Sequence, residues 1–319
     1  MKALILAGIG AAPGKTTLAA GLAQAWQAQG KRVGYMRIGM PSDNADAEFF
    51  ADALHVPTEI VGMPSAMLSP GLSAADIVLV ELADDVADDG GHQRLSEAAT
   101  ALDAAVLLVM GYTQHLDFSV ARTAGEHLGG RWVGAVINGV PQIVSSNISQ
   151  AAKAGLGEDV HDLGQISESR GLLGLGVSDL AGFLQASVVG KAPKDALIEN
   201  FMIGANGADP ALTYFAPKAG AAVFCRVDRP DIQHAALDAS VRCLILTGEG
   251  HPQQNVVNRA EDKGVSVLRV TAETIETVES LTGFVETVRF RQQAKLPIVR
   301  GLLASLPIVG QLEQALGLS

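Results

Sequence analysis

Several features are scarce or missing in this 319-residue sequence, and each shortage excludes a class of protein. Only two cysteines occur, Cys225 and Cys243, both in apolar surroundings, so we expect two buried thiols in a reducing compartment and no disulfide framework. No uninterrupted apolar segment reaches membrane-spanning length, and the apolar run at the start is too short for a signal peptide. The sequence therefore predicts a cytoplasmic protein without a membrane partner.

An excess of positive charge is also absent, because the formal net charge is −11. This balance argues against a general binder of nucleic acids or anionic membranes, although it leaves room for a local anion site. The seven histidines are scattered without metal-ligand spacing, so we expect no structural metal. The chain is 48% hydrophobic and 18% charged, and its length allows two domains. This composition predicts a folded chain with substantial cores.

The first twenty residues, MKALILAGIGAAPGKTTLAA, place a short apolar run before a glycine-rich segment and a helix-forming stretch. This order of strand, loop and helix is what a phosphate-binding loop requires. The lysine would reach the outer phosphates, and the hydroxyl of Thr16 would ligate Mg²⁺. An ordinary strand-to-helix turn is the alternative. The residues predicted to bind the nucleotide here are Gly8, Gly10, Gly14, Lys15, Thr16 and Thr17.

The spacing of the loop differs from two common patterns. The usual phosphate loop would need glycine at position 9, which is Ile9, and five residues separate Gly8 from Gly14 instead of four. A dinucleotide fingerprint would need glycine at position 13, which is Pro13, and would leave the lysine and threonine without a role. We therefore discount the nicotinamide interpretation.

Apolar runs and helical stretches alternate along the first half of the chain, which predicts a doubly wound parallel sheet with helices on both faces. The expected strands are 3–7, 32–38, 77–81, 104–110 and 132–138, and the expected helices are 16–29, 45–54, 95–101, 120–128 and 147–154. Ligands bind such sheets at the carboxyl ends of the strands, so functional residues should follow the strands.

Polar residues do follow these strands. Asp46 opens a helix, either as a carboxylate that favours the helix dipole or as a Mg²⁺ ligand. Glu81 closes an apolar strand, and we favour a metal anchor over a solvated strand end. Asn138 ends the fifth strand, where its amide could contact a nucleobase or cap the following turn. The acidic run of Asp84, Asp85, Asp88 and Asp89 is interpreted as a solvated loop.

The second half of the chain predicts a smaller α/β unit. Residues 157–192 are interpreted as linking structure with a strand at 160–166 and a helix at 177–184. The strands 221–227, 242–247 and 265–270 then alternate with the helices 230–239, 253–263 and 273–281. Polar residues again follow strands at 228–229 and 247–248. This block could therefore bind a small ligand or serve as a packing or dimerisation module. The tail from 295 to 316 has helical spacing interrupted by Pro297 and Pro307, and should dock on its own domain or on a partner.

The N-terminal half resembles the dethiobiotin synthetase-like P-loop proteins, which include a region of the long phosphotransacetylases and the cobyrinic acid a,c-diamide synthase group. The similar segments are Gly8–Thr16, Val33–Arg37, Asp46, Val80–Glu81 and Ile137–Asn138. The resemblance implies ATP and Mg²⁺ as cofactors, Thr16, Asp46 and Glu81 as metal ligands, Asn138 as a base contact, and a homodimer or larger homo-oligomer.

Two positions depart from that pattern. Arg37 stands where the synthetases have a lysine that handles the substrate carbamate, and arginine is a poor proton acceptor. Leu82 replaces the glycine after the strand-end glutamate. We nevertheless take Lys15 and Arg37 as the candidate catalytic residues, with Lys15 stabilising phosphoryl charge and Arg37 clamping a substrate carboxylate.

The second α/β block is similar to the DRTGG domain that accompanies this P-loop domain in phosphotransacetylases, on the segments Val227–Ile232 and Leu246–Gly248. The expected organisation is a nucleotide-binding domain at 1–190, a DRTGG-like domain at 191–290 and an amphipathic tail at 291–319. No acetyltransferase domain is expected in this chain.

Three functions remain open from the sequence. The first is an ATP- and Mg²⁺-binding regulatory or sensor protein whose DRTGG-like domain binds a second small ligand or mediates assembly. The second is an ATP-dependent carboxylate ligase or amidase-type synthase. The third is a structural partner with a vestigial nucleotide site. Whether the chain is an enzyme is therefore an open question at this stage.

Overall fold

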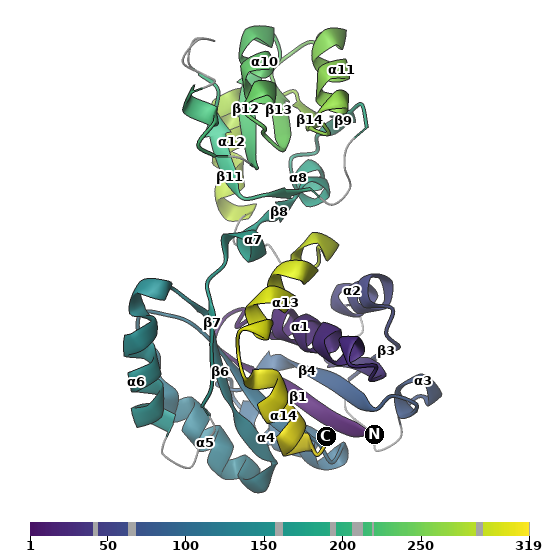
Figure 1. The fold of residues 1–319 in the computed structure, drawn as a ribbon, viewed down its shortest axis with the longest axis vertical. Coiled ribbons are helices and arrows are strands. Elements are labelled where there is room, and N and C mark those ends of the chain that lie inside the picture. Colours follow the sequence, from purple (N-terminus) through teal and green to yellow (C-terminus); the bar gives the residue numbers. More distant parts are fainter. Residues whose placement is uncertain are drawn as a thin grey trace. The chain divides into compact units, whose positions relative to one another are not determined.

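The chain forms two compact units in a computed structural model that describes residues 1–40, 44–62, 68–156, 162–191, 196–205, 213–218, 220–284 and 290–318. Unit 1 combines Met1–Ser169 with Lys295–Ser319, and unit 2 is Arg170–Ala294. Unit 2 is thus an insertion in the sequence of unit 1. The elements of both units are labelled in Figure 1.

Unit 1 is built on a seven-stranded sheet in the order β3-β2-β4-β1-β5-β6-β7, in which every neighbouring pair is parallel. Its strands are β1 (Lys2–Ile9), β2 (Val33–Ile38), β3 (Thr58–Val61), β4 (Ile77–Asp85), β5 (Ala105–Gly111), β6 (Trp132–Val140) and β7 (Asp162–Ser167). Its helices are α1 (Lys15–Ala28), α2 (Ala45–Leu54), α3 (Pro70–Ser73), α4 (Gly91–Ala101), α5 (Phe118–Leu128), α6 (Ser145–Leu156), α13 (Leu296–Ala304) and α14 (Ile308–Leu316). The predicted doubly wound α/β fold is confirmed.

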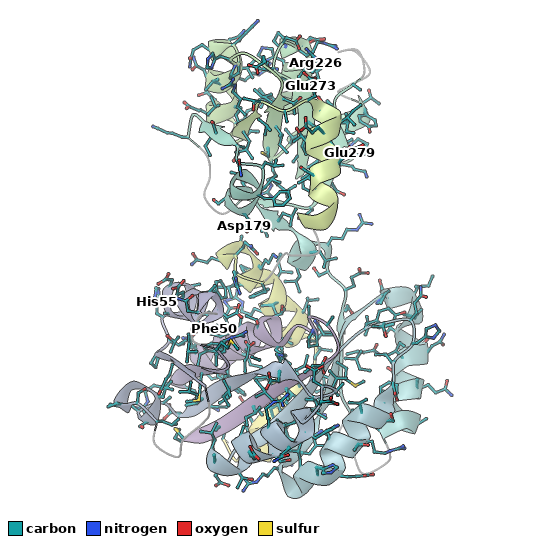
Figure 2. The ribbon with its side chains drawn as sticks, turned by 180° about the vertical axis from the view of Figure 1, so that it is seen from behind. Phe50, His55, Asp179, Arg226, Glu273 and Glu279 are labelled. Carbon is teal, nitrogen blue, oxygen red and sulfur yellow. The ribbon has the colours of Figure 1, made fainter. Side chains whose placement is uncertain are left out.

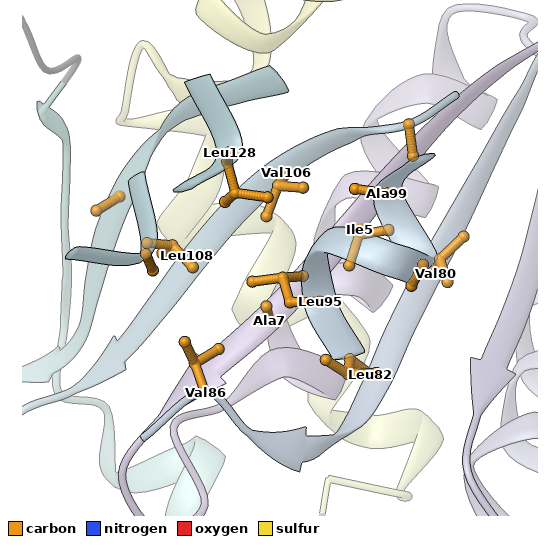
Figure 3. Close-up of a cluster of buried hydrophobic side chains, with 14 of the residues drawn as sticks. Ile5, Ala7, Val80, Leu82, Val86, Leu95, Ala99, Val106, Leu108 and Leu128 are labelled. Carbon is orange, nitrogen blue, oxygen red and sulfur yellow. The ribbon is translucent and has the colours of Figure 1, made fainter. Parts of the chain in front are cut away.

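The central strand β1 is buried on both faces, which explains its almost continuous apolar sequence. Side chains alternate across a strand, and Ile5 and Ala7 pack into a cluster with Leu95 and Ala99 of α4 (Figure 3). The opposite face carries Leu4, and α1 lies against this region of the sheet, where it contacts β1, β2 and β4. The core thus holds β1, and the loop that follows it, at the middle of the sheet.

The last helices of the chain belong to unit 1. Pro297 lies in the first turn of α13, Pro307 precedes α14, and the two helices are bent by 79° at the break. Helix α13 packs so closely on α1 that a methyl group on Gly21 would collide with Leu303. Within the described part of the chain, no single helix is both long and apolar enough to cross a membrane, and the bent pair reaches that length and composition only when its two helices are added together.

Unit 2 is a smaller α/β unit with a five-stranded sheet in the order β11-β12-β13-β14-β9, parallel except for β9. A short antiparallel pair, β8 and β10, accompanies it. The strands are β8 (Leu175–Gly176), β9 (Ser187–Val189), β10 (Leu197–Ile198), β11 (Asn200–Ile203), β12 (Ala221–Arg226), β13 (Cys243–Thr247) and β14 (Ser266–Val270). The helices are α7 (Arg170–Leu173), α8 (Val177–Phe183), α10 (Pro230–Asp238), α11 (Gln254–Asp262) and α12 (Thr274–Phe284).

Residues 157–192 were interpreted as linking structure with one strand and one helix, and the structure has both, as β7 and α8, but each is part of a compact unit. Strand β7 is an edge strand of the unit 1 sheet, and Gly157–His161 lie outside the described residues. Helix α8 packs Val177 and Leu180 into a core cluster of unit 2 with Phe224. The structure therefore begins unit 2 at Arg170, ahead of the position 191 that the sequence indicated.

The two cysteines are free and buried in unit 2, as expected. Burial raises the pKa of both thiols, of Cys225 to about 12 and of Cys243 further still. Neither thiol is therefore ionised at neutral pH.

Candidate functional site

The loop between β1 and α1 has an alternating backbone that suits an anion. Gly10, Ala12 and Gly14 have positive φ angles of 88°, 46° and 91°, while the ring of Pro13 holds its φ in the negative region. Backbones that alternate in this way point successive N–H groups into one concavity. Helix α1 starts at Lys15, and no side chain caps its N-terminus, so its first N–H groups are available to a ligand.

Lys15 folds back over the end of β1. A β-carbon on Gly8 would lie 3.0 Å from Nζ of Lys15 and 2.6 Å from Cγ of Pro13, so a glycine is needed there for the lysine to approach. Burial lowers the pKa of Lys15, and the nearby Glu81 partly opposes that effect. The ammonium group therefore lies at the loop, where it would meet the outer phosphates of a nucleotide.

Glu81 lies next to Thr16 at the end of the apolar part of β4. The hydroxyl of Thr16 donates a hydrogen bond of 3.0 Å to Oε2 of Glu81. The Glu81 side chain is 0% exposed; its Oε1 accepts no well-formed hydrogen bond from the described residues, although the buried hydroxyl of Tyr35 lies close enough to interact with the carboxylate. Burial, with repulsion from Asp46 as the next cause, raises the pKa of Glu81 to about 7.

Arg37 lies between the two carboxylates that the sequence assigned to the metal. Its Nη1 donates a 3.0 Å hydrogen bond to Oδ2 of Asp46 and lies 3.9 Å from Oε2 of Glu81. The side chains of Arg37 and Asp46 are only 11% and 9% exposed. The structure thus gives the candidate catalytic arginine a partner within the site.

Tyr35 lies beside this cluster on β2. Its ring stacks on Phe50 of α2, with centroids 3.9 Å apart and planes 11° apart; Figure 2 labels Phe50 on that helix. Burial, together with the charges of Glu81 and Asp46, raises the pKa of Tyr35. The stack anchors α2, and with it Asp46, against the sheet.

Asn138 supports the loop from the neighbouring strand β6. Its Nδ2 donates a 3.1 Å hydrogen bond to the carbonyl oxygen of Pro13, and a methyl group on Gly14 would collide with the same amide. The Asn138 amide therefore touches the nucleotide loop, and its expected contact with a base stays a prediction. Thr17 lies half-buried in the first turn of α1.

Sequence reasoning missed one residue of this site. Asp85 is the last residue of β4 and not part of a solvated loop, and its Oδ2 accepts a 2.8 Å hydrogen bond from the backbone N–H of Gly10. Asp84 also lies in β4 and pairs with Arg94 at 2.5 Å. A possible signal was the position of these carboxylates within four residues of Glu81, just after the strand predicted at 77–81.

The residues present fit a Mg²⁺ ion that is bound together with phosphate. The buried carboxylate of Glu81 and the adjacent hydroxyl of Thr16 offer hard oxygen ligands, and Mg²⁺ in nucleotide sites needs only one or two carboxylates besides phosphates and waters. Over the described residues, no group of three or more His, Cys, Asp and Glu side chains could hold a metal without such help. Asp46 would serve as a ligand only by sharing its carboxylate with Arg37.

Several polar side chains at the strand ends of unit 2 bond within the unit, although Oε1 of the buried Gln233 has no hydrogen-bond partner among the described residues. Arg226 pairs with Asp228, and Thr247 shares a 2.6 Å hydrogen bond with Thr274. Gln233 is buried and donates from Nε2 to the carbonyl oxygens of Arg226 and Val227. These contacts explain the folding of the connection after β12, and the expected second ligand stays a prediction.

The fold and the loop together define a parallel α/β unit with a phosphate-loop geometry, joined to a second α/β unit. Residues 179–284 match the family model of the DRTGG domain, which confirms the DRTGG-like domain expected in unit 2. The predicted relation to phosphotransacetylases is a separate claim and stays a prediction.

Comparison with solved structures gives partial overlaps. The CBS and DRTGG domains of the regulatory region of Clostridium perfringens pyrophosphatase, complexed with the activator diadenosine tetraphosphate, align with 46% of this chain at 16% identity and a TM-score of 0.33. FlhF complexed with GTP/Mg²⁺ aligns with 52% at 16% identity and a TM-score of 0.41. The alignments cover 57% and 65% of those two chains. The MinC:MinD cell division complex of Aquifex aeolicus aligns with 54% of this chain and 84% of the other, at 15% identity and a TM-score of 0.38. Function has to be inferred from the site itself.

Proposed function

We propose that unit 1 binds ATP with Mg²⁺ and that the protein is a nucleotide-dependent regulator or sensor. The observation that carries the proposal is the convergence of Lys15, Gly8 and the Thr16–Glu81 pair on one loop. Lys15 would hold the outer phosphates, and the N–H groups of the loop and of α1 would hold the inner ones. When bound, Mg²⁺ would supply charge neutralisation at Thr16 and Glu81.

The regulatory role is supported by what surrounds the loop. Arg37 bonds Asp46 within the site, so it would have to leave that partner to clamp a substrate carboxylate as a ligase mechanism requires. The chain also carries a DRTGG domain, for which we propose binding of a second small ligand or a role in assembly. A homodimer is part of the same proposal, and sedimentation with and without nucleotide tests it.

Calorimetric titration of ATP with Mg²⁺ into the wild type, Lys15→Ala and Lys153→Ala tests the proposal. Lys153 is an exposed lysine on α6 and serves as the matched control. Loss of a charge-assisted contact to phosphate costs about 1.5–3 kcal/mol, so Lys15→Ala should bind ATP about ten- to hundredfold more weakly, while Lys153→Ala binds like the wild type.

ADP release is measured on the same samples. Binding with little ADP formed supports a sensor, whereas rapid release that depends on a carboxylic acid or an amine would favour the ligase. If the wild type binds no nucleotide, or if Lys15→Ala binds it equally well, the proposal is wrong.

A further inference from the structure

The carboxylate of Asp85 is bound to the first turn of the phosphate loop. Its Oδ2 accepts the N–H of Gly10 at 2.8 Å, and its Oδ1 accepts the N–H of Ala87 at 2.9 Å. The N–H of Val86 donates to the carbonyl oxygen of Gly8 at 2.9 Å. The loop and the connection between β4 and α4 are therefore fastened together.

Asp85 lies at the end of the loop where the outer phosphates belong. Gly8 and Asp85 are register partners on neighbouring strands, and Lys15 places its ammonium beside Gly8. In a phosphate loop the lysine reaches the β- and γ-phosphates, whereas the N–H groups nearer the helix hold the inner phosphates. The N–H of Gly10, which an outer phosphate oxygen could accept, is occupied by a carboxylate oxygen instead.

The charge of Asp85 is not neutralised in the way its neighbour's is. Asp84 pairs with Nε of Arg94 at 2.5 Å. Both oxygens of Asp85 accept backbone N–H groups, and no lysine or arginine in the described part of the chain forms an ion pair with it. The Asp85 carboxylate interacts with the Lys15 ammonium at a distance, without an ion pair, so its negative charge is only partly offset where the terminal phosphate of a nucleoside triphosphate would bring more.

We propose that Asp85 is a specificity residue that makes unit 1 prefer a nucleoside diphosphate over the triphosphate when no divalent cation is bound. The inference rests on the proposed nucleotide binding. A diphosphate leaves the Asp85–Gly10 contact in place, whereas a triphosphate has to displace the carboxylate or accept its repulsion. A divalent cation compensates that repulsion, so the preference weakens when Mg²⁺ is present.

Titration of ADP and ATP, each in EDTA and in Mg²⁺, into the wild type, Asp85→Asn and Asp88→Asn tests this inference. Asp88 is exposed in the same connection and is the matched control. In EDTA we expect the wild type to bind ADP about tenfold more tightly than ATP, and Asp85→Asn to bring this ratio close to one. Asp88→Asn should keep the wild-type ratio.

An unchanged ratio in Asp85→Asn, or an equal change in Asp88→Asn, would overturn the inference while leaving nucleotide binding intact. Failure of all three proteins to bind either nucleotide would overturn the proposed function and this inference with it. Hydrogen exchange on the wild type gives a test that needs no variant. ATP in EDTA should speed exchange over residues 83–90 and ADP should not, and identical exchange with both nucleotides would count against the inference.

Discussion

Both units consist of a largely parallel sheet with helices, yet they differ in how far their charged side chains are exposed to solvent. Unit 1 buries Glu81 completely and leaves Arg37 and Asp46 only 11% and 9% exposed. Unit 2 keeps its strand-end charges in exposed pairs, such as Arg229 and Asp231 at 39% and 43%. Figure 2 labels two further charged residues at the strand ends of unit 2, Arg226 and Glu273.

This difference separates a cluster of nearly buried charges from strand ends whose charged pairs stay in water. Removing charges from water costs free energy of folding, which a partner seldom fully offsets. An exposed pair costs little and contributes little. The cluster in unit 1 is therefore hard to explain by stability alone, whereas the exposed pairs in unit 2 cost little free energy of folding.

The sharpest test of this contrast removes one carboxylate from each kind of pair. Asp46→Asn leaves the buried Arg37 without its close carboxylate, and we expect the free energy of unfolding of unit 1 to fall by about 2–4 kcal/mol. Asp231→Asn should cost below about 1 kcal/mol, because its pair is exposed. Urea unfolding followed by tryptophan fluorescence reports on unit 1 alone, since the only tryptophans, Trp26 and Trp132, both lie there. Circular dichroism follows the whole chain, and equal costs for the two variants would contradict the contrast.

A second comparison uses two glycines that follow strands and have nearly the same backbone. Gly14 has φ of 91° and Gly248 has φ of 88°. A methyl group on Gly248 would be 3.7 Å from Oε1 of Glu273, whereas on Gly14 it would collide with Asn138. We expect Gly248→Ala to cost about 1 kcal/mol from backbone strain alone, and Gly14→Ala about 2–3 kcal/mol.

A double variant isolates the collision. Combining Gly14→Ala with Asn138→Ala should recover about 1 kcal/mol relative to the sum of the single costs, because the clashing amide is gone. Thermal unfolding of the four proteins measures this, and strict additivity would show that Asn138 does not restrict the loop.

A further comparison concerns pH. The pKa of Glu81 is raised to about 7 in the folded state from an ordinary value of 4.5, so the folded protein holds an extra proton between those values. Its contribution to stability is therefore greatest at low pH and declines as pH rises toward 7. In EDTA, Glu81→Gln should remove about 1–3 kcal/mol of this decline between pH 5 and 8, as measured by urea unfolding. Glu273→Gln, at an exposed site, should show the same decline of stability with pH as the wild type. If Glu81→Gln also showed the wild-type decline, burial of Glu81 would not be its cause.

Long, strongly patterned elements could be predicted from the sequence, and short ones could not. The helix at 45–54 was predicted with the bounds that α2 has, because its apolar residues recur at helical spacing. Strand β3, at Thr58–Val61, escaped prediction since four residues with an internal glutamate give no clear alternation. Strands β9 and β11 are similarly short edge strands whose pairing depends on distant partners.

The candidate site divides in the same way. The loop from Gly8 to Thr16 is local in sequence, so its residue spacing was enough to find it. Glu81 lies beside this loop because its strand, β4, pairs with β1. The partnerships of Arg37 with Asp46 and of Asp85 with Gly10 depend on side-chain orientation across strands. A run of aspartates carries no information about which one turns toward a backbone N–H.

The split of unit 1 around unit 2 has a consequence for how the protein is made. Helix α13 packs on α1, and Lys31 bonds the carbonyl oxygen of Leu318 at 3.0 Å, so unit 1 needs residues from both ends of this sequence. A ribosome delivers the whole of unit 2 before the pieces that complete unit 1 emerge. Unit 2 can therefore finish folding first, while unit 1 is still incomplete and the apolar face of α1 that α13 will cover is exposed. During that interval the apolar face of α1 is open to aggregation until α13 emerges and covers it.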